Sequence, residues 1–248
     1  DGGAIYGTGS RGHPVFYVRG MMLVNNTAGI YGGGLFIEGS LGKQSSVEAI
    51  LANGNTAGYG GGVASRYANV RIHNVLFFAH KALQSGGAVY ASLGRLYVSS
   101  CHFMRVTAMM SGGMIFIDGA DTLIKDTLML SGRAEYGGSV YCTSSTPIKV
   151  HLESTKIFNS IASSGGGGGY SSVCSINLVE SVVSNNMANS GNGGGWLLSL
   201  KAEANIVLST FDNNVAGNLG GAIACEACSL VNLTQKSKVQ NNKANQGG

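Results

Sequence analysis

The sequence predicts an all-β fold, a parallel β-helix (solenoid) of about nine coils with about 27 residues in each coil. A pair of glycines followed by a short apolar run recurs along the whole chain, at intervals of 25 to 31 residues. A fixed period in this range is typical of stacked repeats, in which each coil buries its apolar face against its neighbours. Between the pairs, apolar and polar residues alternate and β-branched residues are frequent, which indicates strands.

The double glycine opens each repeat. Glycine reaches positive φ and allows close backbone approach, so each pair is expected at a bend immediately before a strand. The second residue after the pair is apolar in eight of nine repeats, and strand alternation predicts that it points inward. The pairs are Gly2-Gly3, Gly33-Gly34, Gly61-Gly62, Gly86-Gly87, Gly112-Gly113, Gly137-Gly138, Gly168-Gly169, Gly194-Gly195, Gly220-Gly221 and Gly247-Gly248. The inward candidates are Ile5, Phe36, Ala64, Val89, Ile115, Val140, Leu197 and Ile223.

Two further columns follow the same period. An alanine precedes every later glycine pair by four to seven residues, and we expect it at a tight interior bend. Two residues before the alanine, asparagine occurs in five of nine repeats, where stacked copies can hydrogen-bond as a ladder. A leucine-rich repeat has a similar period, but the regular leucine framework that it requires is missing. The alanines are Ala28, Ala57, Ala82, Ala108, Ala134, Ala162, Ala188, Ala216 and Ala244, and the asparagines are Asn26, Asn55, Asn186, Asn214 and Asn242.

The composition supports one elongated repeat domain over residues 1–248. Hydrophobic residues make up 44% of the chain and charged residues 11%, which is enough apolar material for a long core. The net charge is +4 and the basic residues are scattered, so nucleic acid is not an expected partner. No run of about 18 apolar residues is present, so we expect no transmembrane helix in this segment. Neither end carries an atypical capping repeat, and we therefore expect a fragment of a longer chain.

The five cysteines suggest an oxidising compartment. Cys142 and Cys174 follow the glycine-led strands of two successive repeats, and a coil rise of ~4.8 Å is compatible with a disulfide between them. Cys225 and Cys228 form a Cys-x-x-Cys motif. We interpret it as a loop disulfide rather than a zinc site, because zinc needs four ligands. Cys101 is left as a buried thiol, and two disulfides would place the chain outside the cell.

Two short motifs carry a family resemblance. Gly-Gly-Ala followed by Ile or Val is complete at 2–5, 86–89 and 220–223, and Phe-x-x-Asn is complete at 211–214. Relaxed versions of the second motif occur at 23–26, 183–186 and 239–242. The pairing resembles the repeat of the polymorphic outer membrane proteins of chlamydiae and of related surface proteins in other bacteria and in protists. This resemblance implies a right-handed β-helix displayed outside the cell, often as an adhesive passenger.

One group of carboxylates is a candidate metal site. Asp126, Glu153 and Glu180 are separated by 27 residues each, which predicts that they stack in adjacent coils ~4.8 Å apart. Such a stack could bind Ca²⁺ through oxygen ligands or shift one pKa through like-charge crowding. The alternative is a solvated outer column balanced by neighbouring lysines. We favour this alternative and expect no resident cofactor.

An aromatic column is the candidate binding surface. Tyr90, Phe116 and Tyr141 occupy the third position after the glycines in three successive repeats, on the face opposite the inward position. Rings in a line can stack on sugars or anchor a protein partner, and they also stabilise a sheet by stacking on each other. Asn25 and Asn232 begin Asn-x-Thr sequons and are candidate glycosylation sites in a secretory pathway.

Three classes of function are consistent with these features. The first is a non-catalytic structural or adhesive protein of the cell surface, with glycans or cell-surface proteins as partners. The second is a self-assembling extracellular filament subunit, because open strand edges template pairing with neighbouring copies. The third is a carbohydrate-active β-helix enzyme, a lyase or hydrolase, and a glycosidase requires two facing carboxylates. We expect the first class, because carboxylates are few and no catalytic motif is present.

Overall fold

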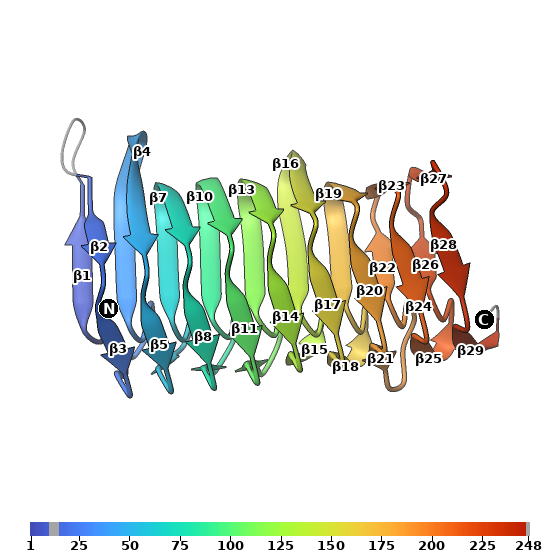
Figure 1. Ribbon diagram of the computed structural model, residues 1–248, viewed down its shortest axis with the longest axis horizontal. Helices are drawn as coiled ribbons and strands as arrows, with labels where there is room; N and C mark the ends of the chain where they lie inside the picture. The colour runs from blue at the N-terminus through green and yellow to red at the C-terminus, as the bar shows by residue number, and fades with distance from the viewer. Residues whose placement is uncertain (10–14, 247–248) are drawn as a thin grey trace.

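The structure is a computed structural model that describes residues 1–9 and 15–246, and these residues form strands and turns without a helix. Figure 1 shows the chain winding in successive coils along the long axis, with equivalent strands side by side. Within the described ranges, each strand pairs in parallel with its equivalent in the next coil. The predicted all-β solenoid of about nine coils is confirmed. The last predicted glycine pair, Gly247-Gly248, lies outside the described residues.

Three sheets run along the solenoid. The first contains β1 (Ile5–Thr8), β2 (Tyr17–Arg19), β4 (Leu35–Glu48), β7 (Val63–His73), β10 (Val89–Ser99), β13 (Ile115–Lys125), β16 (Val140–Glu153), β19 (Gly169–Val179), β22 (Trp196–Ser199), β23 (Glu203–Val207), β26 (Ile223–Glu226) and β27 (Leu230–Thr234). The second contains β3 (Met22–Val24), β5 (Leu51–Asn53), β8 (Leu76–Phe78), β11 (His102–Met104), β14 (Leu128–Leu130), β17 (Lys156–Phe158), β20 (Val182–Ser184), β24 (Thr210–Asp212) and β28 (Lys238–Gln240). The third contains β6 (Thr56–Ala57), β9 (Lys81–Ala82), β12 (Thr107–Ala108), β15 (Arg133–Tyr136), β18 (Ile161–Gly165), β21 (Met187–Ala188), β25 (Val215–Leu219) and β29 (Lys243–Gln246).

Each coil changes direction at residues in the left-handed backbone region. A non-glycine residue there costs roughly 1–2 kcal/mol, so repeated use requires compensation from the surrounding structure. Glycine opens the first sheet in each coil, with φ near 65°, as at Gly86 and Gly220. The corner from the first to the second sheet uses Ala49, Asn74, Ser100, Asp126, Ser154, Glu180 and Leu208, and the corner from the second to the third uses Asn25, Gly54, Ala79, Arg105, Ser131, Asn159, Asn185, Asn213 and Asn241.

An asparagine ladder supports the corner between the second and third sheets from inside. Asn186 donates from its backbone N and its Nδ2 to Oδ1 of Asn214, both at 3.0 Å, and Asn214 donates in the same way to Asn242 at 2.9 Å. Each Nδ2 also donates to a backbone carbonyl of the preceding coil. Asn26 and Asn55 make the same contacts near the N-terminus. The predicted asparagine column is therefore a hydrogen-bonded ladder that satisfies buried backbone groups.

A hydroxyl ladder supports the corner between the first and second sheets. The backbone N of Thr155 donates to Ser181 Oγ at 3.1 Å, and that of Ser181 donates to Ser209 Oγ at 3.0 Å. The hydroxyls donate in turn to carbonyls of the preceding coil. Cys101 takes this position in its own coil, with its thiol 3.7 Å from the carbonyl of Ile72. It is a free, buried thiol that substitutes for a ladder hydroxyl, and burial raises its pKa to about 11.

The two sequence motifs have a direct structural explanation. In Phe-x-x-Asn, Phe211 is fully buried, Asn213 takes the left-handed corner and Asn214 joins the ladder. In Gly-Gly-Ala, Gly220 has positive φ, and a Cβ on Gly221 would overlap the backbone of the next coil. Each motif therefore encodes one corner of the coil, because its residues meet separate steric or hydrogen-bonding demands of that corner.

The structure corrects the predicted inward column in three coils. Where three glycines occur in succession, the first two form the corner, so the inward residue comes one position earlier than expected. Phe36, Ala64 and Leu197 therefore align with the aromatic column on the opposite face, while Leu35 and Val63 point inward. The prediction failed there because a glycine has no side chain to show which face its position occupies.

Small and large side chains fill the interior in separate columns. The alanine column is buried along the third sheet, where Ala57, Ala82 and Ala108 pair in register. On the second sheet, Phe77 and Phe103 are fully buried and stack with ring centroids 4.7 Å apart.

Replacing Asn214 by Ala is expected to destabilise the solenoid by about 2–4 kcal/mol, because the buried donors of Asn186 lose their acceptor. Denaturant unfolding at neutral pH measures this cost. The matched control is Asn213→Gly at the adjacent left-handed corner, where φ is 52° and the side chain is exposed. That change is expected to be neutral or slightly stabilising. Equal losses in both variants would contradict a special role for the ladder.

His80 interrupts the asparagine ladder and makes stability depend on pH. Its Nδ1 accepts from the backbone N of Asn55 at 3.1 Å, and its buried Nε2 has no hydrogen-bond partner among the described residues. Burial lowers the pKa of His80 from 6.5 to about 4. The unfolded chain therefore takes up the proton first as pH falls. The stabilising contribution is complete above pH 6.5 and is lost as the pH falls toward 4.

The expected loss between pH 7 and pH 4 from this residue is about 3 kcal/mol. His80→Asn restores the residue type of the column, so its stability is expected to vary less with pH over this interval. Parallel unfolding curves at several pH values measure the difference between the two proteins. The same pH profile in both would show that His80 does not carry the effect.

Candidate binding surface

The aromatic column runs along the N-terminal halves of the long strands. Tyr90, Phe116 and Tyr141 lie in register on β10, β13 and β16. Their ring centroids are 5.3 and 5.2 Å apart, with interplanar angles of 3° and 4°. The column continues to Tyr170, whose ring centroid lies 4.8 Å from that of Tyr141. The rings thus stack face to face along the axis of the solenoid.

Because the rings of the aromatic column stack on each other, a ligand could reach only their edges. Each ring face between Tyr90 and Tyr170 covers its neighbour, so the rings present edges and hydroxyl groups outward. Tyr90 is only 8% exposed, and burial raises the pKa of Tyr90 and of Tyr141 to about 12. The central rings therefore stabilise the sheet, and sugar stacking on their faces is blocked.

A second aromatic column lies beside the first, immediately before the glycine corners. Tyr31 and Tyr59 pair in adjacent coils and stack with centroids 5.3 Å apart. The next two coils carry Ser85 and Ser111 at this position, and Tyr136 follows in register. The sequence could have predicted this second column, because each of these residues immediately precedes the first glycine of its corner. Alignment on the last glycine, which varies in position, concealed it.

The two serines leave a hollow of about 360 Å³ beside the first column. Gln84 accepts a hydrogen bond from the hydroxyl of Tyr59 at one end of it. Asp118 accepts from the hydroxyl of Ser92 at 3.4 Å and is the one formally charged residue of the lining. The lining residues are Tyr59, Gln84, Ser85, Tyr90, Met110, Ser111, Phe116, Asp118, Tyr141 and Thr143. The hollow therefore combines aromatic edges with hydrogen-bonding groups, of which only the Asp118 carboxylate is charged.

The predicted carboxylate stack is wrong. Pairing of β13 with β16 sets Lys125 against Glu153, so Asp126 lies one position further along than Glu153. Asp126 and Glu180 occupy left-handed corners, with Ser154 at the corner between them. Strand pairing steps by 28 residues from Lys125 to Glu153 and by 26 in the next coil. Equal spacing of 27 in the sequence therefore hid a shift of one residue.

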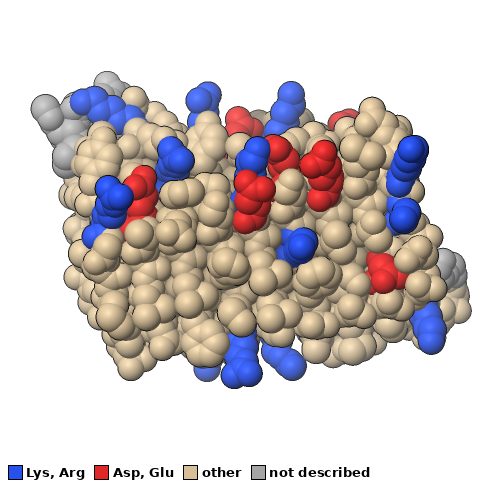
Figure 2. Space-filling model, in the orientation of Figure 1, with Lys and Arg blue, Asp and Glu red and all other residues tan. Residues whose placement is uncertain are grey.

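Glu153 forms an ion pair instead. Lys125 Nζ lies 2.7 Å from Glu153 Oε1, and this hydrogen bond lowers the pKa of the Glu153 carboxyl. Within the described residues, no group of three or more His, Cys, Asp or Glu side chains is placed to hold a metal ion. Figure 2 shows positive and negative side chains interspersed in a band across the upper part of the face in view, and basic side chains alone at its lower edge.

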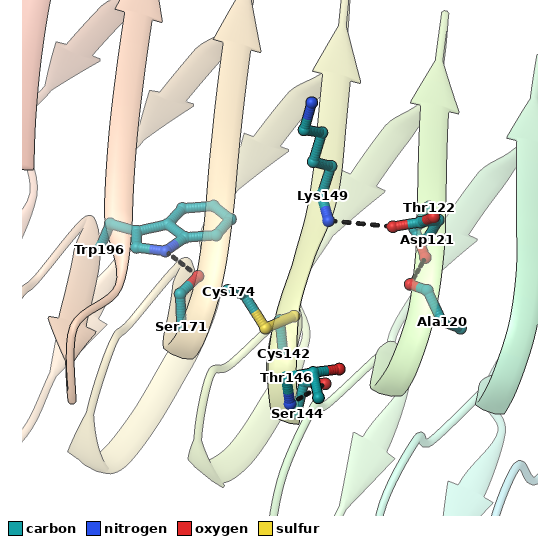
Figure 3. Close-up of a disulfide and its surroundings, with 10 residues drawn as sticks. All are labelled: Ala120, Asp121, Thr122, Cys142, Ser144, Thr146, Lys149, Ser171, Cys174 and Trp196. Carbon is teal, nitrogen blue, oxygen red and sulfur yellow. Dashed lines mark hydrogen bonds between the residues drawn. A yellow bond between two sulfur atoms is a disulfide. The ribbon is translucent and has the colours of Figure 1, made fainter.

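The structure contains two disulfides. Cys142 and Cys174 are fully buried and join β16 to β19, with their Cα atoms 6.3 Å apart (Figure 3). The bridge lies where extra residues of β16 shift the strand register, between Thr143 and Ile148. Cys225 and Cys228 form the second disulfide, with a Cα separation of 5.4 Å. The first bridge straps two coils together at an irregular point of the first sheet.

The two sequons lie in different settings. Asn25 is exposed at a left-handed corner. Asn232 is exposed on β27, and its Nδ2 donates to Asn205 Oδ1 at 3.1 Å in an outward asparagine ladder. Modification of Asn232 would interrupt that ladder, whereas Asn25 is free of this constraint on the outer surface.

No protein-family model, curated protein or solved structure matches this chain. Within the described residues, no helix is long and apolar enough to cross a membrane. The function of the binding surface must therefore be inferred from its own geometry and chemistry.

The two disulfides are expected to contribute unequally to stability. The chain-entropy model gives about 3–4 kcal/mol for Cys142–Cys174, which are 32 residues apart, and about 1–2 kcal/mol for Cys225–Cys228, which are three apart. Paired Cys→Ser variants of each bridge, unfolded in denaturant, measure the two costs. Cys101→Ser is the control and is expected to change little, because serine is a natural member of its ladder. A larger loss from the second bridge would contradict this ranking.

Proposed function

We propose that this chain is a β-helical rod of an extracellular, cell-surface protein with a structural and adhesive role and no catalytic activity. The observation that carries the proposal is the buried Cys142–Cys174 disulfide. A buried bridge between two coils belongs to the native packing, and such bridges form and persist in oxidising environments. The resemblance of the repeat to bacterial and protist surface proteins points in the same direction.

The use of polar residues also supports a structural role. The buried side chains of Asn186, Asn214, Ser181 and Ser209 are committed to the two ladders inside the solenoid. On the surface, Glu153 is paired with Lys125, and Arg66 with Glu38 at 3.5 Å. A carboxylate pair free to act as acid and base across a glycosidic bond would argue for an enzyme, and these ion-paired groups lack that arrangement.

An apolar outer face supports contact with partners. Sheets with one exposed face usually alternate apolar and polar residues, but the second sheet carries apolar side chains on both faces. Its outward, half-buried residues include Leu51, Leu76, Phe78, Met104, Leu128, Leu130 and Phe158. Figure 2 shows few charges over β8, β11 and β14. Asn53, His102 and Lys156 interrupt this face, and the apolar side chains between them offer contacts to another protein or a neighbouring rod.

The location is tested on intact cells of the source organism. An antibody against this chain is expected to label unpermeabilised cells, and mass spectrometry of the labelled protein is expected to find Cys142 linked to Cys174. An antibody against a cytosolic protein is the control for cell integrity. Labelling that requires permeabilisation, or recovery of both cysteines as free thiols, would contradict the proposal.

A further inference from the structure

We propose that the hollow between Tyr59 and Tyr141 binds a neutral saccharide segment about two sugar rings long. This inference deepens the proposed adhesive role and rests on it for its biological setting. Binding itself is measured on the isolated chain, so it can fail while the surface location stands.

The length of the hollow follows from a gap in the second aromatic column. Tyr31 and Tyr59 fill two successive coils, Ser85 and Ser111 leave the next two open, and Tyr136 closes the column again. Two coils at ~4.8 Å each make an opening of ~10 Å, which is the length of a disaccharide. Tyr59 stacks on Tyr31 and lines the N-terminal end of the hollow. Tyr90 packs on the same ring at 5.0 Å with an interplanar angle of 54°, so Tyr59 offers its remaining exposed edge to one end of a bound sugar chain.

The lining matches a polyhydroxyl ligand. The serine hydroxyls both donate and accept, the Gln84 amide does the same, and the Asp118 carboxylate accepts. Carbohydrate hydroxyls need this mixture, and the apolar faces of a sugar can lie against Tyr59 and against Met110, which is 51% exposed. No lysine or arginine lines the hollow, and Asp118 repels sulfate, phosphate and uronate groups. The chemistry therefore favours a neutral glycan over an acidic one.

A peptide strand is a poorer fit to the same hollow. Peptides recognised by sheets add to an open strand edge through backbone hydrogen bonds. Here β10 is paired on both sides, with β7 and β13, and β13 is paired with β10 and β16. The backbone beside the hollow has no open edge, so recognition must come from the side chains that line it.

The test uses the whole 248-residue chain on an array of neutral hexose and N-acetylhexosamine oligosaccharides with sulfated counterparts, followed by calorimetric titration of the hits. The wild-type chain is expected to bind neutral oligosaccharides selectively. Ser111→Tyr extends the aromatic column into the hollow and is expected to weaken binding at least tenfold, with an unchanged β spectrum. Asp118→Asn keeps the shape and is expected to weaken binding about tenfold through loss of a charge-assisted hydrogen bond.

The matched control is Ser175→Tyr, which adds the same ring to the outer face of β19 away from the hollow and is expected to bind like the wild type. If Ser111→Tyr fails to fold, the Asp118→Asn result decides. The proposal is overturned if the wild-type chain binds no neutral oligosaccharide, if it binds only the sulfated ones, or if the folded hollow variants bind as well as the wild type. Cleavage of a bound oligosaccharide would also overturn the non-catalytic role proposed for the chain.

Discussion

The left-handed corner is the constraint on which the rest of this structure depends. A coil can close only if its backbone reverses at fixed points, and most of these points carry ordinary residues with φ near 50°. Each such residue is strained, so the position behind it must hold the turn in place. In several coils asparagine does this at one corner and a small hydroxyl residue at the other, and in others a buried apolar residue such as Val75 or Val106 takes the position. Stacking then repeats the contacts from coil to coil, and the sheets follow from the register that the ladders set.

Because the interior polar groups are committed to corners, the candidate binding surface lies on the outside of the solenoid. Asn186, Asn214 and their equivalents have their donors and acceptors satisfied by neighbouring coils, and no chemistry remains for a ligand. His80 and Cys101 take ladder positions and have pKa values moved away from neutrality by burial. The buried thiol and imidazole, which a sequence alone would suggest as a nucleophile and a base, therefore have structural roles in the corners.

The hollow on the outer surface exists because two coils carry serine where neighbouring coils carry tyrosine. If every coil carried a tyrosine at the position of Tyr31 and Tyr59, the second aromatic column would be unbroken and would cover the first. Serine in two successive coils opens the second column while the first stays stacked beneath it. A repeat protein can therefore create a recess without changing its backbone, because the backbone is already specified by the corners.

The sequence by itself determined the fold class, the number of coils, the glycine corners and the asparagine column, because period, glycine position and asparagine position are local properties. The tertiary structure alone decided register. Coil lengths vary by a few residues, so equal spacing placed Asp126, Glu153 and Glu180 together although strand pairing separates them. The same variation hid Phe36 among the inward residues and left the hollow beside Tyr59 unseen. Which side chains meet across coils depends on where each loop absorbs its extra residues, and only the paired strands show that.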